Sequence, residues 1–316
     1  MSAQQPLRLA AVLNPAAGSD GEQLIAALAS SDAARVRVIS TTAAGDAADI
    51  AYKLAADAEP VDAVVSVGGD GTVFEVATGL WRAREAGVTA VPPLLVAPGG
   101  TGNSVYRGLW NDVPWEAVVG HVTSGRARTR SLDLARIEQN DQIVVLGSGS
   151  GLFAQTLVKA AELPGSGRQL LMDAALAAMM EHVPYQGRIV VDGKVVHEGG
   201  VVETIVGGFR YRGGLLNLVP RSMLDDGLLD ITVVTDEADM NTFAHATLAG
   251  DVYEVPGIRW GRGEHVVVER VDGEPLLYEH DGEVMPRTGP ACGLRVLPAA
   301  LDVLTTPETP DWFREG

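Results

Sequence analysis

The chain has 316 residues, of which 46% are hydrophobic and 21% charged, so we expect a globular protein of two domains with a sizeable core. A formal net charge of −17 excludes neither enzymes nor binding proteins, but it disfavours nucleic acid and strongly anionic lipid as electrostatic partners. The single Cys292 excludes an internal disulfide, no apolar run approaches ~20 residues, and the N-terminus lacks signal-peptide features, which together predict a cytoplasmic protein.

The first part of the chain, residues 1–130, alternates strand and helix patterns. Strands are expected near 7–13, 35–40, 62–67 and 93–97, and helices near 21–30, 46–57, 72–86 and 114–124. Such alternation is typical of a doubly wound parallel α/β sheet with helices on its faces. Residues 1–130 are therefore predicted to form a nucleotide-binding domain.

Glycine-rich loops follow three of these strands. Gly68-Gly69-Asp70-Gly71-Thr72 follows the run VDAVVSV, Pro98–Asn103 follows the strand that ends at Ala97, and Asn14–Ser19 follows the first strand. Glycines let backbone approach a ligand closely, and free N–H groups at a helix start bind anions such as phosphate. Strand ends in a parallel sheet lie at one edge, so we expect the loops to share a nucleotide site. No loop matches a P-loop, because no lysine follows the glycines.

Asp70 lies among the donors of its loop and can hold a carboxylate near a phosphate, with Mg²⁺ or a hydroxyl proton between them. The alternative from the residues alone is a glycine-rich turn with an aspartate that caps a helix.

Residues 131–316 are strand-rich and predict an antiparallel, sandwich-like domain with helices near 167–182 and 238–249. Asp192-Gly193 is a strong two-residue hairpin signal. Whether the C-terminal segment, about 298–316, returns to the first domain stays open.

The best candidate for chemistry in the second part is the turn His280-Asp281-Gly282-Glu283. Two carboxylates that flank a glycine can supply a base and a metal or hydrogen-bond partner, most usefully in a cleft between domains. The same letters also describe an ordinary hairpin turn.

Seven motifs, in order, resemble the diacylglycerol kinase catalytic-domain family, which includes sphingosine kinases and bacterial lipid kinases. They are NPAAG (14–18), GDA (45–47), GGDGT with Glu75, APGGTGN (97–103), LDLARIE (132–138), LDDGLLDI (224–231) and DGE (281–283). NAD kinases and phosphofructokinases share the GGDG loop, and the late DGLLD and DGE segments distinguish the lipid-kinase branch.

The resemblance implies ATP as the phosphate donor, Mg²⁺, and a lipid hydroxyl as the acceptor, with diacylglycerol converted to phosphatidic acid as the leading reaction. It also implies that the nucleotide site is lined by Asn14, Gly68, Gly69, Gly71, Thr72, Glu75, Gly99, Thr101, Gly102 and Asn103. Asp281 would accept the hydroxyl proton with support from Glu283, although sphingosine kinases use the position of Asp70, so both stay candidates.

The resemblance further implies two roles for metal. Asp133 would be the carboxylate that orients the catalytic metal. Some bacterial relatives bind a separate structural ion, Mg²⁺ or Ca²⁺, through a loop that corresponds here to Met223, Asp226 and Leu228.

Ser19, Phe74 and Ser104 stand where relatives often carry a cation, an asparagine and an aspartate. These departures keep open a nucleotide- or lipid-binding regulator with weak or no catalysis. The acidic net charge separately keeps open a kinase of a sphingoid or soluble alcohol, and an NAD kinase is the least favoured alternative. By position, residues 147–185 would frame the entrance for acyl chains, and the enzyme would act peripherally at the inner membrane face. A homodimer through a sheet edge also stays open.

Overall fold

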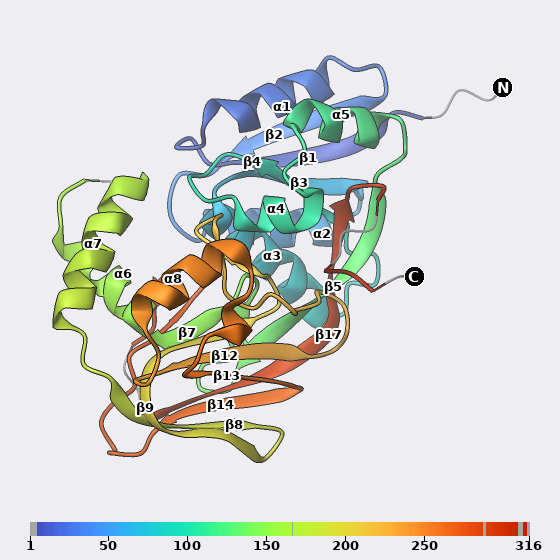
Figure 1. Ribbon diagram of the computed structural model, residues 1–316. Helices are drawn as coiled ribbons and strands as arrows, with labels where there is room; N and C mark the ends of the chain where they lie inside the picture. The colour runs from blue at the N-terminus through green and yellow to red at the C-terminus, as the bar shows by residue number, and fades with distance from the viewer. Residues whose placement is uncertain (1–4, 166, 287–288, 309–311, 315–316) are drawn as a thin grey trace. The chain divides into compact units, whose positions relative to one another are not determined.

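A computed structural model describes residues 5–165, 167–286, 289–308 and 312–314. The chain folds into two compact units (Figure 1). Unit 1 comprises Met1–Leu132 and Ala299–Gly316, and unit 2 comprises Asp133–Pro298. The C-terminal segment thus belongs to the first unit. Unit 1 is a parallel α/β domain and unit 2 is built of antiparallel strands, so the predicted fold class is confirmed.

The sheet of unit 1 runs in the order β2–β1–β3–β4–β17, and these pairings are all parallel. Its strands are β1 (Leu7–Leu13), β2 (Ala34–Ser40), β3 (Ala63–Gly68), β4 (Leu94–Pro98) and the end of β17 (Ala291–Thr305). Every residue of β3 is buried, as expected for a central strand covered on both faces. The four predicted strands agree with β1 to β4 within about two residues.

The helices of unit 1 are α1 (Ser19–Ala29), α2 (Asp46–Ala56), α3 (Asp70–Glu85), α4 (Ser104–Trp110) and α5 (Trp115–Thr123). Helices α2 and α3 pack closely because Gly79 has no side chain; a Cβ there would lie 2.1 Å from the Ala48 carbonyl oxygen. Helix α3 begins at Asp70, two residues earlier than predicted, so Asp70 lies in its first turn.

The strands of unit 2 form an antiparallel array in the order β16–β15–β7–β9–β8–β14–β17, and β12 pairs with both β9 and β13. The longer strands are β7 (Ser148–Gly151), β8 (Tyr185–Val191), β9 (Lys194–Gly207), β12 (Leu229–Thr235), β13 (Ile258–Gly263), β14 (His265–Arg270) and β15 (Tyr278–His280). Short pieces are β6 (Ile143–Val144), β10 (Tyr211–Arg212), β11 (Leu216–Asn217) and β16 (Glu283–Val284), and β5 (Arg128–Ile137) leads into the unit. Asp192 and Gly193, with φ of 47° and 75°, form the predicted hairpin turn between β8 and β9.

Helices α6 (Leu152–Glu162), α7 (Gly167–Glu181) and α8 (Met240–Ala249), with the short 3₁₀ turn η1 (Val252–Glu254), accompany this sheet. The predictions of α7 and α8 are confirmed, whereas α6 was not predicted. Strand side chains such as Ile189, Val206 and Ile231 form one buried core, and Phe243 of α8 belongs to another. Among the described residues, no helix combines the length and apolarity needed to cross a membrane.

Candidate active site

Three loops of unit 1 meet at the carboxyl ends of the neighbouring strands β1, β3 and β4. The Gly18 N–H donates to the Gly99 carbonyl oxygen at 2.9 Å, and the Asn14 N–H donates to the Val67 carbonyl oxygen at 2.9 Å. The first loop is therefore bonded to both of the other segments. The structure brings together the three glycine-rich loops that the sequence analysis grouped.

Close contact between the backbones of the loop at 68–72 and the loop at 98–103 depends on glycine. A Cβ on Gly99 would lie 3.1 Å from backbone atoms of Gly68, and one on Gly100 would lie 2.4 Å from the Gly69 Cα. At Gly71, by contrast, a Cβ would meet nothing within 4 Å, and the residue is exposed. The paired loops thus leave the first turn of α3 open, which is the place where a phosphate can approach N–H groups.

Asp70 links the two glycine-rich loops through its carboxylate. Its oxygens accept the Ser104 N–H at 3.0 Å and the Val105 N–H at 3.1 Å, both in the first turn of α4. An anion there interacts favourably with the helix dipole. The observed contacts therefore give Asp70 the capping role that the residues alone had left open.

The polar residues around these loops have specific partners. The Asn14 side-chain amide donates to the Thr72 hydroxyl at 3.1 Å, and the Asn103 side-chain oxygen accepts the Gly100 N–H at 2.8 Å. Asn103 itself has a φ of 51°. Thr101 is exposed and Gly102 is half-buried. These contacts fix the shape of the loops before any ligand is bound.

Glu75 makes contacts that the sequence did not predict. Its carboxylate accepts the Gly45 N–H at 3.0 Å and the Ala47 N–H at 3.1 Å, at the start of α2. This is the arrangement of a helix cap supplied from a neighbouring helix. Glu75 therefore ties α3 to α2.

In unit 2, Asp281 lies in the turn between β15 and β16 with a φ of 51° and a side chain that is 2% exposed. Its carboxylate accepts the Leu146 N–H at 2.5 Å and the Val145 N–H at 3.1 Å. The Asp281 N–H donates in turn to the Gly147 carbonyl oxygen at 2.8 Å. These three bonds hold the turn against residues 145–147, which the sequence analysis did not connect with it. Glu283, on β16, is exposed.

Two buried carboxyl groups beside this turn were not predicted. Burial raises the pKa of Glu279 to about 7, and its side chain accepts the Gly282 N–H at 3.2 Å. Burial also raises the pKa of Glu203 well above its ordinary value, and one of its oxygens accepts the Phe153 N–H at 2.6 Å. On β7, which lies between their strands, Gly149 is opposite Glu279 and Gly151 is opposite Glu203. A signal was present in the sequence, since each glutamate interrupts an apolar strand.

Asp133 and the loop that follows Met223 are bonded to each other. The Asp133 N–H donates to the Leu224 carbonyl oxygen at 2.8 Å, and its carboxylate accepts the Gly227 N–H. Within the loop, Asp226 accepts the Leu228 N–H at 3.1 Å and pairs with Arg262 at 3.4 Å. The structure thus brings the predicted metal residues together, with a guanidinium beside Asp226.

Among the described residues, carboxylates and other side chains that could bind a metal ion are few in any one place. In the part of the chain that the structure describes, no group of three or more His, Cys, Asp or Glu side chains is arranged to hold one. Mg²⁺ in nucleotide enzymes usually needs only one or two carboxylates, with phosphate and water completing its shell. Asp70 is a carboxylate of this kind at the start of α3.

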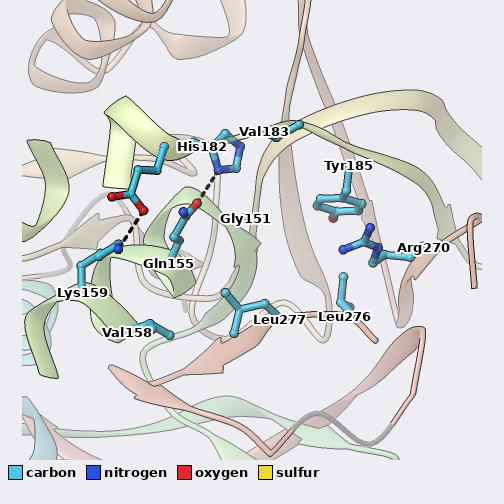
Figure 2. Close-up of a pocket in the computed structure, with 11 residues that line it drawn as sticks. Gly151, Gln155, Val158, Lys159, His182, Val183, Tyr185, Arg270, Leu276 and Leu277 are labelled. Carbon is cyan, nitrogen blue, oxygen red and sulfur yellow. Dashed lines mark hydrogen bonds and ion pairs between the residues drawn. The ribbon is translucent and has the colours of Figure 1, made fainter. Parts of the chain in front are cut away.

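A cavity of about 390 Å³ lies in unit 2, where α6, the segment after α7 and the approach to β15 meet (Figure 2). Val158, Leu276 and Leu277 give it an apolar side. Its polar side includes Lys159 paired with Glu181 at 2.8 Å and His182 bonded to Gln155 at 2.8 Å. Burial lowers the pKa of His182. One wall is thus apolar and the other polar, with Lys159 paired to Glu181 and the Nδ1 of His182 bonded to Gln155.

Two protein families match this chain in succession. The diacylglycerol kinase catalytic domain matches residues 8–137, and the YegS C-terminal NAD kinase beta sandwich-like domain matches residues 145–305. The second match covers half of the chain, and together they span both units.

Relatives and solved structures agree with this assignment. A "Probable lipid kinase YegS" of Escherichia fergusonii is 27% identical over 308 residues, covering 92% of this chain and 94% of that protein. A "Probable lipid kinase YegS-like" of Stenotrophomonas maltophilia is 28% identical over 182 residues, or 56% of this chain and 57% of that protein. Two crystal structures from Bacillus anthracis str. Sterne, at 23% and 22% identity, have TM-scores of 0.73 and 0.68, each covering 96% of this chain and 99% of the other.

The order of domains and the loops described above define a kinase that combines a parallel α/β domain with a β sandwich-like domain. The chain belongs to the bacterial YegS-like lipid kinase family.

Proposed function

We propose that this protein transfers the γ-phosphoryl group of ATP to the free hydroxyl of diacylglycerol and so forms phosphatidic acid. The family supplies the reaction class, and one of the Bacillus anthracis relatives is named as a diacylglycerol kinase. The observation that carries the proposal is the packing of Gly68 and Gly69 against Gly99 and Gly100, which leaves the exposed Gly71 at the start of α3.

The nucleotide phosphates would bind at the start of α3. N–H groups at the start of a helix point along its axis towards its N-terminal end, and the helix dipole favours negative charge there. Asn14, Thr72 and Asn103 hold the three loops in this shape. No lysine is needed in such a site, because backbone donors and a metal ion together balance the phosphate charge.

Asp70 would hold Mg²⁺ with help from the phosphates. When bound, the ion supplies neutralisation of the charge that develops on the transferred phosphoryl group. Asp133 is hydrogen-bonded to the loop at 224–228, so any influence it has on the catalytic Mg²⁺ would pass through that loop. A second ion bound by Met223, Asp226 and Leu228 stays a prediction.

Asp281 is the preferred base. Two backbone N–H donors hold its carboxylate in place, and a carboxylate can take the proton as the lipid hydroxyl oxygen attacks the γ-phosphorus. The bond between that phosphorus and the bridging oxygen breaks, ADP leaves, and the proton remains on the carboxyl group until solvent removes it. Glu283 is exposed and would assist from the same turn. Asp70 stays the alternative base.

The cavity of unit 2 is the proposed site for the lipid. Its volume of about 390 Å³ falls within the usual range for small-molecule pockets. The apolar wall of Val158, Leu276 and Leu277 suits part of an acyl chain, and the polar wall suits ester or glycerol oxygens.

The proposal is tested by transfer of labelled phosphate from γ-labelled ATP to diacylglycerol, monoacylglycerol, ceramide and sphingosine in mixed micelles with Mg²⁺. We expect labelled phosphatidic acid as the main product and no product when the metal is chelated. Preferred labelling of sphingosine, or of a soluble alcohol, would replace diacylglycerol as the acceptor. ATP binding without transfer to any acceptor would indicate a regulator and contradict the proposal.

A further inference from the structure

Helix α7 carries its large apolar side chains on the outside of the protein. Met172, Leu176, Met179 and Met180 are 55%, 62%, 48% and 89% exposed, and Val183 just beyond the helix is 79% exposed. Single exposed apolar residues are common on protein surfaces, but five in twelve residues are not.

These side chains occupy one face. The spacing of four, seven and eight residues from Met172 places Leu176, Met179 and Met180 with it along a single stripe of the helix. Val183 extends this apolar surface two residues after the helix ends. Ala174 and Ala178, which are fully buried, lie on the opposite face, and α7 packs against α6. A helix that belonged entirely in water would bury the leucine and methionines and expose the alanines.

One charged residue borders the stripe: Asp173 is exposed three residues before Leu176 and seven before Met180, and its carboxylate accepts a hydrogen bond from the Gln169 side-chain amide at 2.8 Å. Residues 174–180 read AALAAMM, and the nearest ionisable groups along the helix are Asp173 and Glu181. Glu181 is paired with Lys159, so the charge at this end is neutralised beside the cavity. The surface therefore offers mainly apolar contact, with the carboxylate of Asp173 at its edge.

A lipid bilayer fits this surface better than a second copy of the chain. A helix of fifteen residues is about 22 Å long and about 10 Å wide, well short of the roughly 800 Å² that each partner buries in a standard interface. A bilayer needs no such area, because an amphipathic helix binds by placing one face among the acyl chains. Val183 belongs both to the stripe and to the cavity, so the apolar surface is continuous with the proposed lipid site.

We propose that the outward stripe of α7, Met172, Leu176, Met179, Met180 and Val183, is a membrane-docking surface that places the cavity against a bilayer. The inference deepens the proposed function and rests on its lipid substrate. Binding through the stripe would be hydrophobic, so it does not require attraction between anionic lipid and a chain with a net charge of −17.

Partition onto sucrose-loaded phosphatidylcholine vesicles, without ATP and without diacylglycerol, tests docking separately from catalysis. We expect the wild type to bind, and to bind equally well in ~0.1 M and ~0.5 M salt, because screening affects only electrostatic attraction. The double variant Leu176→Gln with Met180→Gln should bind at least about ten-fold more weakly, since each side chain loses its transfer from water. Leu248→Gln, which changes a leucine of α8 that is 66% exposed, is the matched control and should bind as the wild type does.

A second measurement places the residue in the bilayer directly. Cys292 is buried, so an environment-sensitive fluorophore on Met180→Cys labels the stripe selectively. We expect its emission to rise on addition of vesicles, while the same label on Leu248→Cys does not respond.

Docking would be overturned if the wild type did not bind vesicles, or if Leu248→Gln lost binding as much as the double variant. It would also be overturned if the fluorophore at position 180 did not respond to vesicles. A dimer in sedimentation that the double variant dissociates would also overturn it, in favour of a second copy. Assay with a short-chain diacylglycerol below its aggregation threshold separates the two proposals. Unchanged turnover by the double variant there supports docking, whereas absent turnover by the wild type contradicts the proposed function alone.

Discussion

The loops of unit 1 and the Asp281 turn of unit 2 are both held by backbone N–H groups, but the two are built differently. In unit 1 the glycines at 68–69 and 99–100 touch through main-chain atoms, and each loop directly follows a buried strand. In unit 2 the donors to Asp281 come from residues 145 and 146, which are 136 and 135 positions away in the chain. The glycine-rich loops follow from local sequence, whereas the contacts of Asp281 depend on segments that are distant in the chain.

The pKa values of carboxyl groups are also shifted in opposite directions in the two units. In unit 1 a hydrogen bond from the Thr42 side chain, with others from nearby N–H groups, lowers the pKa of Asp46. In unit 2 burial raises the pKa of Glu279 and of Glu203. Protonation of Asp46 at low pH should therefore weaken its hydrogen bonds in unit 1. Deprotonation of Glu279 and Glu203 at higher pH should lower the stability of unit 2.

The largest expected effect on stability is the pH dependence that comes from Glu279. Its pKa rises from 4.5 to about 7 on folding, so the folded state holds the proton more tightly. The stabilisation is complete below pH ~4.5 and is lost as the pH rises through about 7. This loss is of the order of 3 kcal/mol. Glu279→Gln removes the titration, so urea unfolding between pH 4.5 and 8 should show that the wild type loses about that much relative to the variant. Parallel curves for the two proteins would show that Glu279 does not titrate in this range.

The next effect concerns contact between the glycine loops. Gly100→Ala places a Cβ against the Gly69 backbone, which must shift, so the free energy of unfolding should fall by about 1–3 kcal/mol. The Kd for ATP should rise at least about ten-fold, because the loops lose their shape. Urea unfolding and titration calorimetry measure the two quantities.

Gly120→Ala is the matched control for that variant. Gly120 lies inside α5 with nothing within 4 Å of an added Cβ, so the same change should stabilise the protein by about 0.5–1 kcal/mol. Equal ATP affinity in wild type and Gly100→Ala would contradict the role of loop contact.

The smallest effect distinguishes two roles for Glu75. As a cap for α2 it contributes about 1 kcal/mol, so Glu75→Gln should lower the free energy of unfolding by that order and leave the KM for ATP unchanged. A raised KM for ATP with unchanged stability would instead support the nucleotide-binding role implied by the resemblance.

The sequence was most informative where structure is local. The strands of unit 1, the loops after them and the Asp192-Gly193 turn follow from strand and turn preferences within a few residues. Helix α6 was missed because it begins directly after the glycine-rich β7, where Gly151 has a φ of 108°, and the GSGSG letters resemble a loop. One N–H group at the start of α6, that of Phe153, donates to the side chain of Glu203 on β9, about fifty residues later in the chain.

The carboxyl groups of unit 2 were harder to predict for the same physical reason. Glu203 and Glu279 become neighbours only because β9 and β15 pair with the two sides of β7, a strand whose glycines leave room for them. Sequence periodicity predicts that a strand exists, but it does not specify the partner of that strand. Asp281 was singled out from its motif, whereas its donors Val145 and Leu146 have no motif of their own.

The central claim, that Asp281 is the base of a lipid kinase, is tested most directly by the kinetics of Asp281→Asn with Mg-ATP and diacylglycerol. Calorimetric ATP binding and the thermal unfolding midpoint are measured on the same preparation. We predict a fall in kcat of about 10²–10⁴-fold, with ATP affinity and the folded state retained. Wild-type kcat in Asp281→Asn, together with a comparable collapse in Asp70→Asn, would contradict the claim and assign the proton transfer to Asp70.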